Sequence, residues 1–182
     1  RDEEVGRLLE VVHHQRDRAL VMLMLRCGLR VEEVSRLKLA ALDLRRSQVF
    51  VHQGKGAKDR VVYLSDDAYE ALVQYLRVRP ASRVKEVFLV DKGRCRGKAI
   101  SVRGIQKRLE YYARQARLKV SCHQLRHTMA TQLLNAEAAL VTIQDLLGHT
   151  RIKTTQRYCR VSNLKVQRDY HRAMAAILQI TG

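Results

Sequence analysis

The feature that most constrains the fold is an uninterrupted apolar run at residues 19–25, bracketed by Arg18 and Arg26. Because such a run leaves no polar face for water, residues 16–27 are predicted to form a buried central helix. Gly28 follows directly and is the residue type that commonly ends a helix. The run is far shorter than the ~20 residues needed to span a bilayer. The sequence therefore predicts a soluble protein, with no membrane partner, built around this helix.

Apolar periodicity recurs along the rest of the chain. It predicts helices at residues 2–12, 31–39, 66–78, 101–118, 123–136 and 140–147, and a tail helix within 163–182. Residues 47–52 and 60–64 favour strands joined by a glycine-containing turn, and residues 86–90 favour a third strand. With one proline and no repeat or linker, residues 1–182 are predicted to form a single mainly α domain with a small three-stranded sheet, an α+β fold.

Charge points to the partner. The chain has 35 Lys and Arg residues but only 18 Asp and Glu residues, which gives a net charge of +17 and a pI near 10.3. A polyanion such as double-stranded DNA is the expected partner. The chain opens on RDEE without Met, which favours a fragment or a processed protein with something missing upstream.

The four cysteines show neither CxxC spacing nor a disulfide framework. They favour reduced thiols and a cytoplasmic location. Cys122 and Cys159 adjoin candidate site residues, but structural zinc sites usually use close ligand pairs. No metal site is therefore expected.

Two basic residues lie at connections between predicted elements, where a side chain can point towards a ligand. Arg30 falls in the short corner between two predicted helices, and Glu33 lies one turn later, where it can orient Arg30. Lys55 lies between two glycines at the predicted hairpin tip, which would give a long side chain a mobile base. For each of them, a merely solvated charge is the alternative interpretation.

The stretch from residue 122 to residue 158 concentrates further phosphate-binding side chains. His123 and Arg126 are three apart and share a helix face, so both can reach the same ligand oxygens. His149 and Tyr158 follow helix breaks. Together with Arg30 and Lys55, they form a candidate site with no carboxylate cluster for magnesium and no phosphate loop for a nucleotide.

These residue types suit phosphoryl transfer without a metal. Two arginines and a histidine can bind the non-bridging oxygens of a phosphodiester as their charge increases. A tyrosine has a pKa near ~10, so it needs a neighbouring base or a positive field to act as the nucleophile. Histidine and arginine supply both.

A second basic group lies between these motifs. A glycine-containing loop at 91–98 and the helix that follows it present positive side chains that could meet a DNA backbone or groove. A solvated face is the alternative. The candidate DNA-binding residues are Arg94, Arg96, Lys98, Arg103, Lys107 and Arg108.

Four short motifs occur in an order and at spacings that are typical of one protein family. They are GLRVEEV, GKGAKDR, HQLRHT and LLGH, the last followed nine residues later by Tyr158. In order and spacing the chain resembles the tyrosine recombinases, the family of site-specific recombinases and phage-type integrases. The resemblance implies a mainly helical catalytic domain with an antiparallel sheet that carries Lys55. It also implies a separate N-terminal DNA-binding domain, which this chain lacks.

The resemblance implies a role for each site residue. Arg30 and Arg126 would clamp the scissile phosphate, and Tyr158 would attack it to give a 3′-phosphotyrosyl link and a free 5′-hydroxyl. Lys55 would be the general acid, His123 would accept the tyrosine proton, and His149 would bind a non-bridging oxygen. Glu33 would support Arg30. No metal, ATP or other cofactor is needed.

The resemblance further implies that the tail helix is exchanged between protomers of a homo-tetramer on DNA. Two alternatives remain open. One is a DNA-binding module with an inactive site, and the other is a type IB topoisomerase, which shares the chemistry but acts as a monomer.

Overall fold

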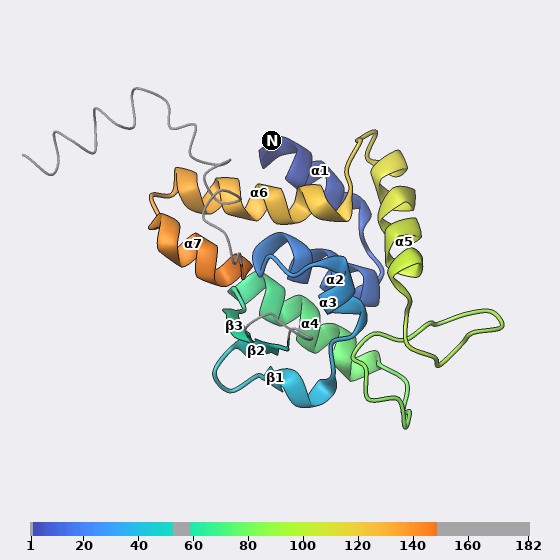
Figure 1. Ribbon diagram of the computed structural model, residues 1–182. Helices are drawn as coiled ribbons and strands as arrows, with labels where there is room; N and C mark the ends of the chain where they lie inside the picture. Colours follow the sequence, from blue (N-terminus) through green and yellow to red (C-terminus); the bar gives the residue numbers. More distant parts are fainter. Residues whose placement is uncertain (1, 53–58, 149–182) are drawn as a thin grey trace, which may run out of the picture. The chain divides into compact units, whose positions relative to one another are not determined.

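The computed structural model describes residues 2–52 and 59–148, all of which belong to the first of two compact units, residues 1–150 (Figure 1). Lys55, His149 and Tyr158 lie outside the described residues, as does the predicted tail helix at 163–182.

The core is organised around helix α2 (Gln15–Arg26), as the apolar run predicts. Each residue from Ala19 to Leu25 is at most 3% exposed. Figure 1 shows α2 between α6 (Cys122–Asn135) and α4 (Asp66–Val78), and both pack on it, as do α3 (Val31–Ser35) and α5 (Val102–Gln115). The prediction of a central buried helix is confirmed.

The remaining helices are α1 (Asp2–Val11) and α7 (Leu140–Leu147), together with a short 3-10 helix, η1 (Leu39–Ala41). The helix predicted at residues 31–39 is shorter than expected. It ends at Ser35 because the next backbone groups pair across the chain: Val87 N donates to Leu37 O at 2.7 Å, and Leu39 N donates to Lys85 O at 2.9 Å. Among the described helices, none is long and apolar enough to cross a membrane.

The sheet is three-stranded and antiparallel, in the order β1 (Leu42–Asp43), β2 (Gln48–Val51) and β3 (Arg60–Tyr63). The strands predicted at 47–52 and 60–64 are confirmed, but the prediction of a third strand at 86–90 is wrong. Residues 86 and 89 make only isolated bridges, and Leu42–Asp43 is the third strand.

The segment at 86–90 is apolar for a different reason: it crosses the core. Val87, Phe88 and Leu89 are fully buried. The Tyr75 hydroxyl pairs with part of the backbone of this segment, since it donates to Val87 O and accepts from Leu89 N, each at 3.1 Å. A buried strand and a buried coil segment therefore leave the same apolar signature.

A close approach of three segments fixes the corner between α2 and α3. Gly28 has φ +65°, and a Cβ there would lie 3.0 Å from Leu147 Cδ2 and 3.1 Å from Met129 Sδ. Only glycine combines this backbone conformation with this contact. The corner is thereby pressed against α6 and the end of α7.

Candidate active site

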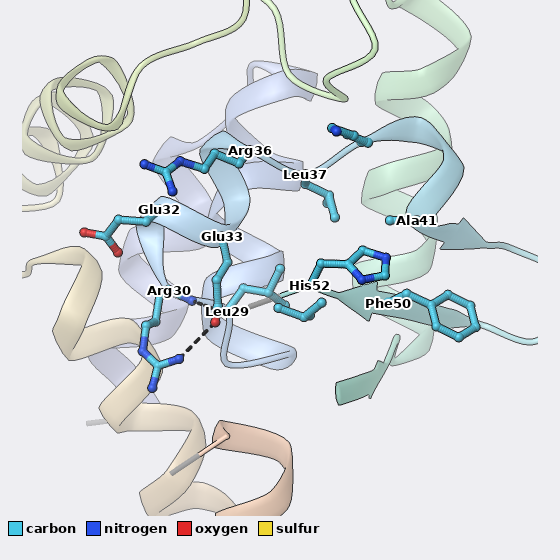
Figure 2. Close-up of a pocket in the computed structure, with 11 residues that line it drawn as sticks. Leu29, Arg30, Glu32, Glu33, Arg36, Leu37, Ala41, Phe50 and His52 are labelled. Atoms are coloured by element: carbon cyan, nitrogen blue, oxygen red, sulfur yellow. Dashed lines mark hydrogen bonds and ion pairs between the residues drawn. The ribbon is translucent and has the colours of Figure 1, made fainter. Parts of the chain in front are cut away.

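Arg30 is the N-cap residue of α3 and follows Leu29, which is fully buried. The backbone is therefore anchored while the Arg30 side chain, 37% exposed, reaches outward. Figure 2 shows Arg30 at the edge of a pocket between α3 and the sheet.

Glu33 holds this arginine in place (Figure 2). Its Oε2 accepts from Arg30 N at 2.7 Å, and its Oε1 accepts from Arg30 Nη1 at 2.9 Å. Burial raises the pKa of the Glu33 carboxyl, but the hydrogen bonds and charges of Arg60 and Arg30 outweigh it, and the pKa falls below its ordinary 4.5. Glu33 is therefore a carboxylate at neutral pH, in contact with Arg30 as the sequence suggested.

Arg60, at the start of β3, was not singled out from the sequence. Its Nη1 and Nη2 each donate to one oxygen of Glu33 at 2.8 Å, and its Nε donates to Leu146 O at 2.8 Å. The available signal was an arginine inside the strand that follows the Lys55 turn. A lone strand arginine ordinarily indicates a solvated residue.

Arg126 joins three segments. Only 4% exposed, it projects from α6 and donates through Nη1 to Gly28 O and through Nη2 to Leu147 O. Gly28 is two residues before Arg30. The arrangement therefore connects the segments that carry the two predicted phosphate-binding arginines.

His123 lies on the first turn of α6, three residues before Arg126. Ser121 caps this helix reciprocally: Gln124 N donates to Ser121 Oγ at 3.3 Å, and Ser121 N donates to Gln124 Oε1 at 2.7 Å. The His123 ring is exposed and meets the His127 ring edge to face, with centroids 4.4 Å apart. The imidazole is thus open to a ligand.

Lys55 belongs to the connection between β2 and β3. The two sides of that connection approach at its base, where His52 Nδ1 and Asp59 Oδ2 lie 3.0 Å apart. β2 and β3, which flank this connection in the sequence, are paired antiparallel as predicted. His149 directly follows Gly148, which ends α7 in a left-handed conformation with φ 60°.

A pocket of about 390 Å³ opens beside Arg30. Its charged lining combines Arg30, Arg36 and Lys38 with the carboxylates Glu32 and Glu33, and the rest is mostly apolar (Figure 2). The mixed lining does not by itself indicate a ligand class.

The candidate DNA-binding residues fall into two classes. Five of them are exposed: Arg94, Arg96, Lys98, Arg103 and Lys107. Lys107 also lines a pocket of about 400 Å³ between α5 and the loop at 90–92. These five exposed residues are from here on called the basic surface, and one of them, Arg103, lies 3.6 Å from Glu110 Oε1 through its Nη1.

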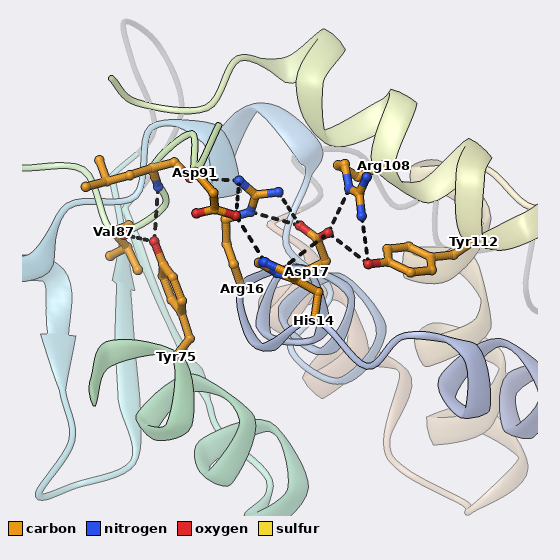
Figure 3. Close-up of polar contacts among 9 residues, drawn as sticks. His14, Arg16, Asp17, Tyr75, Val87, Asp91, Arg108 and Tyr112 are labelled. Carbon is orange, nitrogen blue, oxygen red and sulfur yellow. Dashed lines mark hydrogen bonds and ion pairs between the residues drawn. The ribbon is translucent and has the colours of Figure 1, made fainter. Parts of the chain in front are cut away.

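Arg108 is partly exposed, but its guanidinium is engaged by groups of the protein (Figure 3). Its Nε donates to Asp17 Oδ2 at 2.7 Å, and its Nη2 donates to the Tyr112 hydroxyl at 2.8 Å. Asp17 also accepts from Arg16 Nε at 2.8 Å and from the Tyr112 hydroxyl at 3.0 Å. Because its guanidinium is engaged in joining α5 to α2, we leave Arg108 out of the basic surface.

No metal-binding group is formed within residues 2–52 and 59–148: no three His, Cys, Asp or Glu side chains converge there. Burial raises the pKa of the Cys122 thiol to about 11, and burial with the nearby Asp67 carboxylate raises that of Cys27 to about 12. Both thiols are protonated at neutral pH and do not supply thiolates.

The comparisons with known proteins agree with this architecture. Residues 1–165 match the phage integrase family. The tyrosine recombinase XerA of Thermococcus kodakarensis is 41% identical over 162 residues, which cover 88% of this chain and 57% of that protein. The crystal structure of XerA recombinase superposes with a TM-score of 0.83 at 29% identity, over 95% of this chain and 64% of the other.

A further solved structure that resembles this chain contains a bound substrate. The XerH site-specific recombinase bound to its difH substrate has a TM-score of 0.78 at 25% identity, over 93% of this chain and 52% of that protein. The chain spans little more than half the length of the curated relatives it matches. On its matched residues and its fold, the chain belongs to the phage integrase family of tyrosine recombinases.

Proposed function

We propose that this chain is the catalytic part of a site-specific DNA recombinase or integrase that cuts and rejoins strands through a covalent 3′-phosphotyrosyl intermediate. One observation carries the proposal: Arg126 on α6 donates to Gly28 O, two residues before Arg30. Two arginine-bearing segments far apart in the sequence are thereby joined at one corner, which supports a shared role for them.

The chemistry follows from the residue types. The Tyr158 oxygen attacks the scissile phosphorus and passes its proton to His123, while the bond from phosphorus to the 5′ oxygen breaks and Lys55 protonates that oxygen. Arg30, Arg126 and His149 bind the non-bridging oxygens as their charge increases.

Glu33 supports Arg30, so that the guanidinium is oriented before the substrate arrives. The positive charge of the arginines takes the place of a metal ion. Because the phosphotyrosyl link conserves the energy of the diester, the 5′-hydroxyl can reverse the reaction without ATP.

Double-stranded DNA is the proposed substrate. The net charge of +17 and the basic surface support it, and one relative is a recombinase bound to a DNA substrate. Since the chain covers only 57% of the XerA sequence, we propose that a further DNA-binding domain completes the clamp around the duplex. We further propose a homo-tetramer on DNA, assembled through the tail at 163–182, that acts in the cytoplasm on the nucleoid.

Trapping of the covalent adduct tests this function. A duplex is first selected from a randomised pool by its binding to the chain and is then made with nicks near its centre, so that the short 5′-hydroxyl fragment diffuses away after cleavage. The wild-type chain should give an SDS-resistant adduct that maps to Tyr158. Tyr158→Phe should abolish the adduct while DNA affinity stays within about 3-fold.

Three results would redirect the proposal. An adduct that survives Tyr158→Phe would refute the assigned nucleophile. Binding without any adduct would indicate a DNA-binding module with an inactive site. Relaxation of supercoils without recombinant products would indicate a topoisomerase of type IB.

A further inference from the structure

We propose that Arg60 is a positioning residue for the phosphate clamp: it orients Arg30 through the Glu33 carboxylate and anchors the last turn of α7, which precedes His149. This inference rests on the proposed function, because it assigns Arg60 a part in the same phosphoryl transfer. Neither GKGAKDR as a motif nor the charge pattern separates Arg60 from an ordinary strand arginine.

The Glu33 carboxylate is the junction of two arginines. Each of its oxygens accepts once from Arg30 and once from Arg60, at 2.7 to 2.9 Å. The parallel bonds from Arg60 Nη1 and Nη2 fix the plane of the carboxylate, which could otherwise turn about its terminal bond. Arg30 Nη1 binds the oxygen that Arg60 Nη1 also holds, so its direction depends on that plane.

The degrees of burial assign different tasks to the two arginines. The Arg60 side chain is 7% exposed and that of Glu33 is 10% exposed, whereas 37% of Arg30 is exposed. Arg60 is thus enclosed with Glu33, while Arg30 reaches towards the ligand. An arginine free to rotate gives up considerable rotamer entropy when it binds, and the enclosed pair removes part of that cost in advance.

The third contact of Arg60 reaches another part of the site. Its Nε donates to Leu146 O at 2.8 Å, and Arg126 Nη2 donates to Leu147 O. The last carbonyls of a helix lack partners within the helix and attract cations. Arginines from β3 and α6 therefore hold two consecutive carbonyls of the last turn of α7, immediately before Gly148.

These contacts make Arg60 a residue that acts through others rather than one that touches DNA. All three of its guanidinium nitrogens donate to protein oxygens, and two of them neutralise the Glu33 carboxylate, whereas Arg126 donates to the uncharged carbonyls of Gly28 and Leu147. A lysine cannot reproduce the arrangement, because its single ammonium lacks the planar fork that spans both Glu33 oxygens and a carbonyl. The expected loss on substitution is therefore in the rate of chemistry and not in DNA affinity.

The test compares Arg60→Gln and Arg60→Lys with a matched control, Arg79→Gln. Arg79 also spans several carbonyls with its guanidinium, those of Val84, Glu86 and Val87, at 2.8 to 2.9 Å. Its loss should lower the melting temperature without affecting the site. Adduct formation is followed in single-turnover reactions on the selected nicked duplex at saturating DNA, well below each melting temperature, and Kd is measured by fluorescence anisotropy.

We expect Arg60→Gln to slow adduct formation roughly 10- to 100-fold, with Kd within about 3-fold of the wild-type value. Arg60→Lys should form the adduct less than about 3-fold faster than Arg60→Gln. Arg79→Gln should form it at the wild-type rate. In a chain that already carries Arg30→Lys, adding Arg60→Gln should cost much less than it does alone, because the group it positions is gone.

An Arg60→Gln rate within about 3-fold of wild type would overturn the inference. A loss that is fully additive with Arg30→Lys would overturn its main claim, that Arg60 acts by orienting Arg30. A rate loss of equal size in Arg79→Gln would show that only folding was disturbed. A wild-type chain that forms no adduct would instead refute the proposed function.

A second measurement reads positioning without DNA chemistry. Nuclear magnetic resonance of ¹⁵N-labelled arginine follows the Arg30 guanidinium, whose signal is assigned by its loss in Arg30→Lys. Its rotation should be restricted in the wild-type chain and rapid in Arg60→Gln. Equal rotation in the two chains would overturn the inference even if no adduct ever formed.

Discussion

Removal of the Asp17 carboxylate tests the reasoning about buried charge most directly. The side chain is 1% exposed and lies where α2 meets α5 (Figure 3). Two guanidinium nitrogens of Arg16 donate to Oδ1 at 2.7 and 2.8 Å, and Arg108 Nε and the Tyr112 hydroxyl donate to Oδ2. Asp17→Ala removes the charge that holds all of these donors together.

The expected loss of unfolding free energy depends on the partners that Arg16 and Arg108 keep in the variant. Breaking a buried ion pair from one side costs about 3–5 kcal/mol, because a charge is left without its partner. Arg16 retains Asp91 at 2.8 Å and Leu89 O at 2.9 Å, and Arg108, 37% exposed, can turn to water. We therefore expect the lower end, about 3 kcal/mol. At roughly 2–4 °C per kcal/mol for a chain of this size, the melting temperature falls by about 6–12 °C.

Urea and thermal unfolding at pH 7 measure this loss, with Asp67→Ala as the control. Asp67 also pairs with an arginine, Arg26, at 2.9 Å, but 46% of its side chain is exposed. Exposed pairs contribute at most about 1 kcal/mol. Asp17→Asn, which keeps an acceptor oxygen, should fall between Asp17→Ala and the wild type. If Asp17→Ala costs no more than Asp67→Ala, the view that this network stabilises the contact between α2 and α5 is wrong.

Three further predictions concern the surface, the thiols and acid. Lys107→Gln and Arg103→Gln should each make the plot of log binding constant for duplex DNA against log salt concentration shallower by about 0.9, as measured by fluorescence anisotropy. An unchanged slope would remove that residue from the basic surface. At pH 8, iodoacetamide should label exposed Cys95 and spare Cys27, whose pKa is raised to about 12; peptide mapping that finds Cys27 labelled first contradicts this. The stability that Glu33 provides should persist above pH 4.5 and vanish as pH falls through its lowered pKa, so melts of wild type and Glu33→Gln should converge in acid rather than diverge.

The helices were predictable because their signal is local. The apolar run at 19–25 and the spacings within residues 66–78 and 140–147 require nothing beyond neighbours in the sequence, and α4 and α7 have the predicted bounds. The third strand was not predictable in this way. Leu42–Asp43 is too short to show an alternation, while residues 86–90 are apolar because they cross the core, where they make only isolated bridges.

The candidate site likewise contains residues that the sequence singled out and residues that it did not. Arg30 and Arg126 could be named from motif and spacing, and the structure connects their segments through Gly28. Arg60 and Arg108 could not be told apart from solvated arginines. One is enclosed with Glu33, and the other is engaged by Asp17.

By itself, the sequence determined the central helix, the strongly positive net charge and the family motifs, because periodicity, composition and residue order are properties of the chain in one dimension. Only the tertiary structure decided which arginines carry which task. Arg60 finds its carbonyl partner 86 residues away and Arg126 finds one 98 residues away. A backbone carbonyl is the same at every position, so no side-chain pattern reveals such a partner before the chain has folded.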